Sequence, residues 1–398
     1  MMALKNFRLA LCVCALCLIA SGALPTTTHN VVLADTPIQH VIVIVKENHT
    51  FDNYFGQFPG ADGAKAVTIN GVTQTPPHAA DSTPDINHSY TSARLAYDGG
   101  KMDKFDQVQG AIVNGFPLTY AQYREEDIPA YWTYAKQFVL FDHYFTSVMG
   151  PSTPNHLFTV AASSGGAIGN AQRTNGKPAC SVPEAIISVL TLFGQITNQR
   201  ACLDIPTLPN ALTQRGLSWK GYGFWPMEVL HRVYDDPELR QNLYREDQLM
   251  PDLQAGKLPA VSWMFGARDE HPPRSVCDGE NWTVEQINAV MKNPSWKSSL
   301  IIVTWDDWGG WYDHVAPRQL DLLGLGFRVP TLVISPYSKQ GYISHQETEH
   351  ASVPKTIEKL FNLPSLNQRD ANANDLLDAL DFSQLPREPL ILPTRTCP

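Results

Sequence analysis

Charged residues are scarce in this chain, and basic residues are scarcer than acidic ones. Only 17% of its 398 residues are charged, with 30 Lys and Arg against 39 Asp and Glu, so the formal net charge is −9. Proteins that bind the nucleic-acid backbone or anionic membranes do so through clustered Lys and Arg. We therefore expect no nucleic-acid partner and no polybasic docking on membranes. A small phosphate ester remains compatible with this charge, because a bound metal ion reverses the local sign.

Long apolar runs are missing after the N-terminal segment, so we expect no stable membrane span. The segment itself has positive residues at Lys5 and Arg8, an apolar run over 9–20 and small residues over 21–23. This order is typical of an export signal. We therefore interpret residues 1–23 as a signal peptide and the mature protein as periplasmic or secreted. The alternative is an uncleaved membrane anchor, which the shortness of the apolar run disfavours.

Cysteine is infrequent, with seven residues, and three of them lie inside the expected signal peptide. The remaining four are Cys180, Cys202, Cys277 and Cys397. An even number in an exported chain permits two disulfides, with three possible pairings. We favour Cys180 with Cys202, which closes the shorter loop, and Cys277 with Cys397. Four free thiols are the alternative.

Short apolar, β-branched runs alternate with helical patterns along the chain. The apolar runs cover 38–46, 299–305 and 329–335, and the helical patterns cover 283–292 and 353–361. Such runs are typical of strands buried on both faces of a parallel sheet, and their alternation with helices predicts an α/β fold. Long Gly- and Pro-containing insertions at 57–84 and 162–209 predict caps around a site. Repeats, heptads and clear linkers are absent, which favours one elaborated domain.

Two of the expected strands end in acidic and polar residues. Glu47 and Asn48 follow the first run, and Asp306 and Asp307 follow the second. Sites in open α/β sheets form at the carboxyl ends of strands, and adjacent carboxylates repel each other unless a cation lies between them. We therefore predict a metal site, with helix capping or solvated Asp as the alternative. Four oxygen ligands favour Ca²⁺, Mg²⁺ or Mn²⁺, unless a neighbouring His joins them.

Ser152 stands between Gly150-Pro151 and Pro154-Asn155, and we expect it to lie in a turn and not within an element. The two prolines make this turn rigid. Rigid placement suits a nucleophile, whose oxygen must be held in line with the leaving group. A hydroxyl is a poor nucleophile at neutral pH, so metal coordination would have to activate it. An ordinary Ser/Thr turn is the alternative.

Four histidines lie in polar, turn-forming contexts: His88, His271, His314 and His350. Each alone is more typical of a hydrogen-bonded structural histidine. Gathered in one pocket, they could protonate a leaving oxygen and place positive charge around a phosphoryl group.

These stretches together resemble a known family. The segments ENHTFDNYFG (47–56), GPSTPN (150–155) and DDWGGWYDHV (306–315) are similar to the opening, nucleophile and second metal motifs of the bacterial phosphoesterase family. That family contains phospholipases C and acid phosphatases and belongs to the alkaline-phosphatase-like superfamily. The resemblance runs from about Ile38 to Leu363. It implies a three-layer α/β/α sandwich, and we expect one phosphoesterase domain over 38–390.

The resemblance also implies roles for the residues singled out above. It implies one divalent metal ion bound by Glu47, Asn48, Asp306 and Asp307, with Ser152 as both ligand and nucleophile. It further implies that the phosphate pocket is lined, in place of a second metal, by His88, His271, His314 and His350.

The chain departs from the phospholipase pattern in several places. Phospholipase members often have Thr at the position of Ser152, Asp-Glu at 306–307 and Arg at the position of His156. Cationic imidazoles in the pocket would favour acidic pH. We therefore expect an exported acid phosphatase acting on small phosphate esters. The alternative is a phospholipase C acting on phospholipid headgroups, and a more remote one is a secreted metal-binding protein without catalysis.

Overall fold

A computed structural model describes residues 36–172, 176–266 and 268–398. The expected signal peptide, residues 1–23, lies outside these described residues. Within them, no helix has the length and apolar character needed to cross a bilayer.

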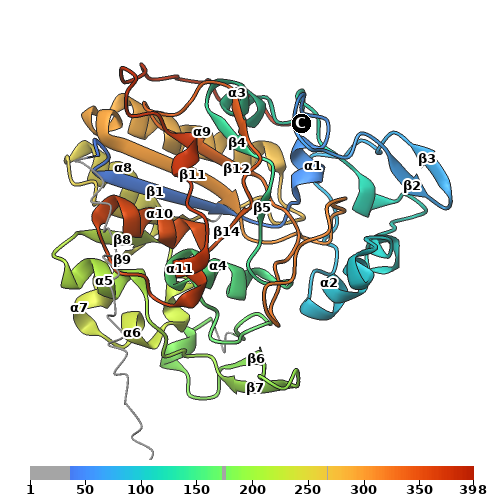
Figure 1. The fold of residues 1–398 in the computed structure, drawn as a ribbon, viewed down its shortest axis with the longest axis horizontal. Helices are drawn as coiled ribbons and strands as arrows, with labels where there is room; N and C mark the ends of the chain where they lie inside the picture. The colour runs from blue at the N-terminus through green and yellow to red at the C-terminus, as the bar shows by residue number, and fades with distance from the viewer. Residues whose placement is uncertain (1–35, 173–175, 267) are drawn as a thin grey trace, which may run out of the picture. The chain divides into compact units, whose positions relative to one another are not determined.

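An eight-stranded sheet lies at the centre of the fold (Figure 1). From one edge to the other its strands are β13 (Tyr342–Ser344), β4 (Val139–Phe141), β12 (Thr331–Ile334), β11 (Ser299–Trp305), β1 (His40–Lys46), β10 (Val261–Phe265), β8 (Trp219–Tyr222) and β9 (Leu243–Tyr244). Every neighbouring pair is parallel except the two that β12 makes with β11 and β4. The predicted α/β fold with a mostly parallel sheet is confirmed.

The three apolar runs predict correctly which strands are buried, but they do not predict whether a strand is parallel or antiparallel to its neighbours. All three apolar runs form central strands, and β1, β11 and β12 are buried along nearly their whole length. The expectation of a parallel strand over 329–335 is wrong, because β12 runs antiparallel to both neighbours. A strand covered by helices on both faces needs apolar side chains on both faces whichever way it runs.

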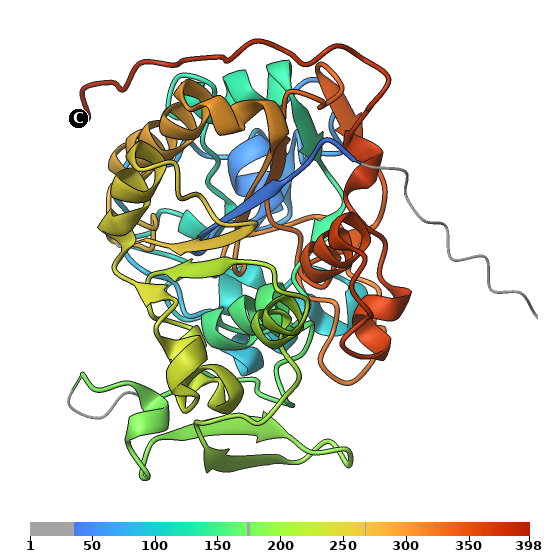
Figure 2. The same cartoon turned by 90° about the vertical axis from the view of Figure 1, so that its left-hand side faces the viewer.

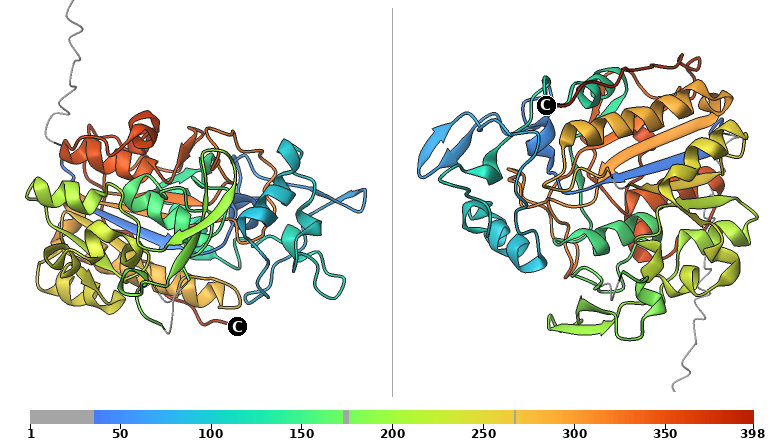
Figure 3. Two further views of the ribbon diagram at one scale, coloured as in Figure 1. Left: turned by 90° about the horizontal axis from the view of Figure 1, so that it is seen from below. Right: turned by 180° about the vertical axis from the view of Figure 1, so that it is seen from behind.

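Helices cover both faces of the sheet, which gives the three-layer α/β/α sandwich (Figures 1 and 2). On one face lie α3 (Pro129–Gln137), α8 (Leu249–Gln254) and α9 (Val276–Lys292). On the other lie α4 (Ser152–Ala161), α5 (Leu208–Gln214), α10 (Ser352–Phe361) and α11 (Gln368–Asn372). The view from behind shows α9 running alongside the strands (Figure 3). The helical patterns at 283–292 and 353–361 fall within α9 and α10, as predicted.

Smaller elements decorate the sandwich. They are α1 (Phe51–Phe55), α2 (Tyr90–Tyr97), α6 (His231–Tyr234), α7 (Pro237–Arg240) and the strand pair β5 (Tyr144–Phe145) and β14 (Thr348–Glu349). Each predicted insertion contains a hairpin, formed by β2 (Val67–Ile69) with β3 (Val72–Gln74) and by β6 (Ile186–Leu190) with β7 (Ile196–Arg200).

Both favoured disulfide pairings are confirmed. Cys180 is bonded to Cys202 across 22 residues, and Cys277 is bonded to Cys397 across 120 residues. The first closes the base of the β6–β7 hairpin. The second ties the C-terminal segment to α9. Crosslinks of this kind stabilise a fold mainly by restricting the unfolded chain.

Candidate active site

The two central strands bring distant acidic residues together. Strands β1 and β11 are parallel neighbours in which Lys46 pairs with Trp305, so the next residues, Glu47 and Asp306, leave the sheet side by side. The Asp306 amide donates a hydrogen bond to the Lys46 carbonyl at 2.9 Å, and the Asn48 amide donates to Asp306 Oδ1 at 2.9 Å. The predicted metal ligands therefore meet at the carboxyl edge of the sheet.

Several polar atoms in this cluster are buried and unpaired. Within the described part of the chain, Asn48 Oδ1, Asn48 Nδ2 and Asp306 Oδ2 have no hydrogen bond of good geometry, although His156 Nε2 lies 3.3 Å from Asp306 Oδ2. Asn48 itself is fully buried and has a positive φ of 64°. Buried polar atoms are almost always paired, so unpaired ones need an explanation. A divalent cation fits these residues, because it would be coordinated by just such oxygens.

The carboxylates repel one another strongly. Burial, followed by the charges of Asp306 and Glu47, raises the pKa of Asp307 well above its usual value. Burial and Asp306 also raise the pKa of Glu47 to about 7, although His156 opposes this shift. Like charges held this close are stabilised by an opposite charge between them. The electrostatics and the unpaired atoms therefore point to the same cation site.

The expectation of a turn outside any element is wrong, because Ser152 is the first residue of helix α4, after the N-cap Pro151. Its side chain is aimed at the acidic cluster. Its Oγ donates to Asp307 Oδ2 at 3.3 Å, and the residue is only 4% exposed. Asn155 fixes the turn, since its side chain accepts from the Val148 amide at 2.9 Å and donates to the Val148 carbonyl at 3.0 Å. The amide groups at the start of a helix favour negative charge, so the position of Ser152 suits a phosphoryl group.

His156 is a site residue that the sequence analysis noted only as a departure from the family pattern. It lies four residues after Ser152 and therefore on the same face of α4. Its Nε2 lies 2.9 Å from Glu47 Oε1, and its ring packs 4.2 Å from that of Trp225. Burial lowers the pKa of His156, but the neighbouring carboxylates of Asp306 and Glu47 outweigh it and raise the pKa to about 9. Reading 152–161 as a helix would have placed His156 here.

A cavity of about 570 Å³ opens beside this cluster. Its polar lining includes Glu47, Ser152, His156 and His271. Three aromatic side chains also line it: Phe224, Trp225 and Phe265. The nucleophile candidate thus lines a cavity that has both polar and aromatic side chains in its wall.

One of the predicted histidines lines the cavity, and a second lies next to it. His271 lines it, and the His88 ring lies 5.6 Å from the His271 ring. His271 Nδ1 lies 2.7 Å from the Pro272 carbonyl, which accepts only from a protonated nitrogen and leaves Nε2 for other partners. Burial lowers the pKa of His271, but the Glu47 charge and the Pro272 carbonyl outweigh it and raise the pKa above its usual value.

His350 contacts the metal-site backbone instead of lining the cavity. Its Nε2 donates to the Asp306 carbonyl at 2.7 Å, and Tyr144 Oη lies 3.2 Å from its Nδ1. Burial lowers the pKa of His350 to about 4. The neutral ring therefore holds the Asp306 segment in place.

Comparison with known proteins identifies the family. The model of the Phosphoesterase family matches residues 38–364. This chain belongs to the phosphoesterase family. It is a hydrolase of phosphoric esters.

Curated relatives of this phosphoesterase are phospholipases C. The chain is 27% identical to non-specific phospholipase C6 of Arabidopsis thaliana, over 90% of this chain and 75% of the relative. It is 28% identical to phospholipase C A of Mycobacterium tuberculosis, over 92% of this chain and 81% of the relative. Among solved structures, a protein of the alkaline phosphatase superfamily from Vibrio parahaemolyticus matches with a TM-score of 0.40 and 11% identity, covering 87% of this chain and 72% of that one.

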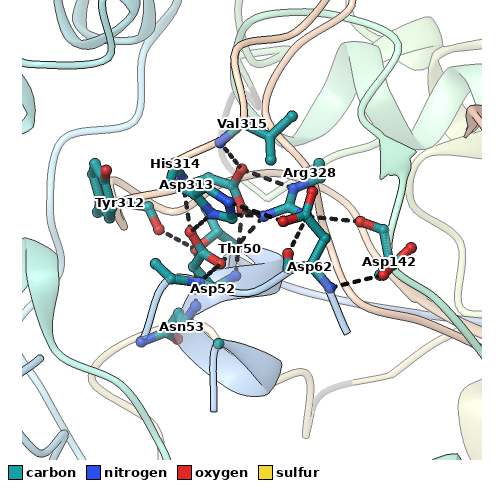
Figure 4. Close-up of polar contacts among 12 residues, drawn as sticks. Thr50, Asp52, Asn53, Asp62, Asp142, Tyr312, Asp313, His314, Val315 and Arg328 are labelled. Atoms are coloured by element: carbon teal, nitrogen blue, oxygen red, sulfur yellow. Dashed lines mark hydrogen bonds and ion pairs between the residues drawn. The ribbon is translucent and has the colours of Figure 1, made fainter. Parts of the chain in front are cut away.

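His314 of this phosphoesterase lies apart from Ser152, in a second polar cluster (Figure 4). Its Nδ1 bonds to Asp52 Oδ2 at 2.7 Å, and its Nε2 lies 3.2 Å from Asp62 Oδ1. Arg328 is fully buried at the centre of this cluster and pairs with Asp52 and Asp313. His314 does not line the cavity that contains Ser152. Of the four predicted histidines, the structure brings only His271 and, beside it, His88 to that cavity.

Proposed function

We propose that this phosphoesterase cleaves phosphate esters with Ser152 as the nucleophile, beside one divalent metal ion. The ion would be held by Glu47, Asn48, Asp306 and Asp307. The observation that carries the proposal is the buried Ser152 hydroxyl, 3.3 Å from Asp307, in a cluster with unpaired buried oxygens. Such an ion, when bound, lowers the pKa of a coordinated hydroxyl and neutralises charge on a phosphoryl group.

The residues of the chain supply orientation. Asp307 accepts the hydrogen bond of Ser152 Oγ and so directs its lone pairs. The Thr153 amide donates to Asn170 Oδ1 at 2.8 Å, which keeps the first turn of α4 in one position. The start of α4 then stabilises the charge that develops on the transferred phosphoryl group.

His271 is the group best placed to protonate the leaving oxygen. Its Nδ1 is occupied by the Pro272 carbonyl, so Nε2 carries the transferable proton in the cationic ring. Ser152 Oγ gives its proton to the Asp307 carboxylate as it bonds to phosphorus, and the ester oxygen departs as an alcohol with the proton from His271. Water then attacks the phosphoserine and gives a proton to the neutral His271. Ser152 Oγ leaves phosphorus, takes back the proton from Asp307 and is restored as a hydroxyl. The raised pKa of His271 favours the cationic form at mildly acidic pH.

We propose phosphate monoesters at acidic pH as the preferred substrates, and export as the cellular fate of the mature chain. The second candidate is hydrolysis of phospholipid headgroups. The names of the curated relatives and the aromatic lining of the cavity by Phe224, Trp225 and Phe265 favour it. Both candidates use the same nucleophile and the same metal ligands.

Turnover of p-nitrophenyl phosphate and of phosphatidylcholine under identical conditions tests the proposal. We expect monoester cleavage that needs a divalent metal and is faster below neutral pH. Diacylglycerol release far above the rate of monoester cleavage would assign the chain to the phospholipases. Folded protein with no turnover of either substrate, with Ca²⁺, Mg²⁺ or Mn²⁺ present, would favour a binding protein.

A further inference from the structure

The tip of the β6–β7 hairpin exposes two large apolar side chains to solvent. Leu192 and Phe193 are each 91% exposed, and Ile196 on β7 is 52% exposed. Adjacent apolar side chains at a convex tip cannot be buried by the hairpin itself. The hairpin lies below the sheet in Figure 1 and at the lower margin in Figure 2. The side chains at the tip are therefore free to contact an apolar surface outside the molecule.

The tip is held by a well-formed hairpin. Strands β6 and β7 pair over five residue positions, and the Thr191 amide donates to the Gln195 carbonyl at 2.9 Å. Gly194 closes the turn with a φ of 75° and donates to the Thr191 carbonyl at 2.9 Å. The Cys180–Cys202 disulfide joins the segments that flank the hairpin. The fold therefore presents Leu192 and Phe193 in a fixed turn.

The hairpin is also connected to the wall of the active-site cavity. Strand β6 bonds to residues 166–172 through the Ile168 amide, which donates to the Ser188 carbonyl at 2.9 Å. In that segment Asn170 and Ala171 line the cavity, and both bond to Thr153, the residue after the nucleophile candidate. Main-chain hydrogen bonds join the hairpin to residues 166–172, and side-chain hydrogen bonds join that segment to Thr153.

Charge identifies the kind of surface that fits the tip. Residues 185–199 contain no Asp, Glu, Lys or Arg, so the whole hairpin up to Arg200 is uncharged. Removal of ionised side chains from water is costly, so an uncharged tip enters a lipid interface more readily than a charged one. The net charge of −9 disfavours an anionic surface.

We propose that Leu192 and Phe193 insert into a zwitterionic lipid surface and dock the protein there with its active-site cavity nearby. This docking goes beyond the phosphoester chemistry proposed above and does not depend on it, because binding to vesicles needs no turnover. Burial of one large apolar side chain strengthens binding by at least about tenfold. Two such side chains give a weak and reversible attachment.

Co-sedimentation with phosphatidylcholine vesicles, without substrate or metal, tests the proposal. We expect the wild type to bind and the double variant Leu192→Ser/Phe193→Ser to lose at least about 100-fold in affinity. Leu385→Ser is the matched control, since Leu385 is 88% exposed in the C-terminal segment, and it should bind as the wild type does. All variants carry the same N-terminal residues, so any contribution of those residues to vesicle binding is the same in each protein.

Two further measurements separate the remaining outcomes. Hydrolysis of soluble p-nitrophenyl phosphate should be equal in the wild type and the double variant, which shows that the cavity is intact. Equal vesicle binding by the wild type and the double variant would overturn the proposal, as would no binding by the wild type. If the wild type self-associates in solution without binding vesicles, and the double variant does not self-associate, the tip binds a second copy of the chain. That result would also overturn the proposal.

Discussion

Two buried clusters of carboxylates in this molecule differ in how their charges are balanced. In the Arg328 cluster, all four side-chain oxygens of Asp52 and Asp313 accept hydrogen bonds, several of them from Arg328 (Figure 4). The Ser152 cluster consists of Ser152 with Glu47, Asn48, Asp306 and Asp307. In it, Asp306 Oδ2 and both polar atoms of the Asn48 side chain lack good hydrogen-bond partners within the described residues. Arg328 and its neighbours thus satisfy every carboxylate oxygen of Asp52 and Asp313, whereas the cationic His156 of the second cluster leaves these atoms without good partners in the part of the chain that the structure describes.

We expect this difference to separate a structural role from a catalytic one. A fully bonded ion-pair network holds the loops after β1 and β11 together, and removal of its cation leaves charges buried. Buried oxygens without partners are costly, and the cation proposed for the second cluster would satisfy them. Substitutions in the first cluster should therefore change stability, and substitutions in the second should change activity.

Ser152→Ala gives the largest expected effect. Loss of the nucleophile should lower kcat for p-nitrophenyl phosphate by at least about 10³-fold, because no other hydroxyl would attack phosphorus as well. The free energy of unfolding should change by less than about 1 kcal/mol. Denaturant unfolding together with steady-state kinetics checks both parts. Near-native turnover by this variant would favour Thr153 or a water molecule as the nucleophile.

Arg328→Leu should have the opposite effect, because we expect it to lower the stability of the fold and not to act on catalysis directly. Without the guanidinium, Asp52 and Asp313 are left buried and unpaired, so the free energy of unfolding should fall by about 3–5 kcal/mol. Arg318→Leu is the control, because Arg318 pairs with Glu347 but its side chain is 66% exposed. That change should cost less than about 1 kcal/mol. Equal losses in the two variants would remove the contrast between the clusters.

His156→Ala tests the imidazole that spans Glu47 and Asp306. Residues that orient metal ligands typically contribute 10- to 100-fold in activity or metal affinity, so we expect a loss of about that size. His156→Arg should recover much of it, because a guanidinium can also donate to both carboxylates. Unchanged metal affinity and kcat in His156→Ala would show that the ligands hold their positions without it.

His314→Gln should have the smallest effect, a loss of stability whose size depends on pH. Burial lowers the pKa of His314, but the hydrogen bond to Asp52 outweighs it and raises the pKa to about 9. A raised pKa contributes stability that is complete below the unfolded pKa of about 6.5 and is lost as pH rises towards 9. The stability difference between wild type and His314→Gln should therefore shrink over that range, from about 1 kcal/mol. A difference that grows with pH would contradict this assignment.

Much of the fold was predictable because its signals are local. The apolar runs that form β1 and β11, and the polar residues that follow them, could be read directly from the sequence. Their meeting followed from a general property of parallel sheets. The direction of β12 could not be predicted, because burial on both faces requires the same side chains in either direction.

The histidines were harder to place, because their roles depend on long-range contacts. His314 follows the predicted metal ligands Asp306 and Asp307 by only a few residues, yet the chain turns it towards Asp52. His350 is bonded to a carbonyl 44 residues away in sequence. His156 could have been found from its spacing to Ser152 once that turn was taken as the start of a helix.

Calorimetric titration of metal-stripped protein with Mg²⁺, Ca²⁺ and Mn²⁺ tests the central claim most directly. The wild type should bind one ion of at least one of these metals per chain. Asp306→Asn, in the Ser152 cluster, should bind it at least about tenfold more weakly. Asp62→Asn, beside Arg328, should bind it as the wild type does. Equal affinity of the Asp306→Asn protein and the wild type, or no binding to the wild type, would contradict the account.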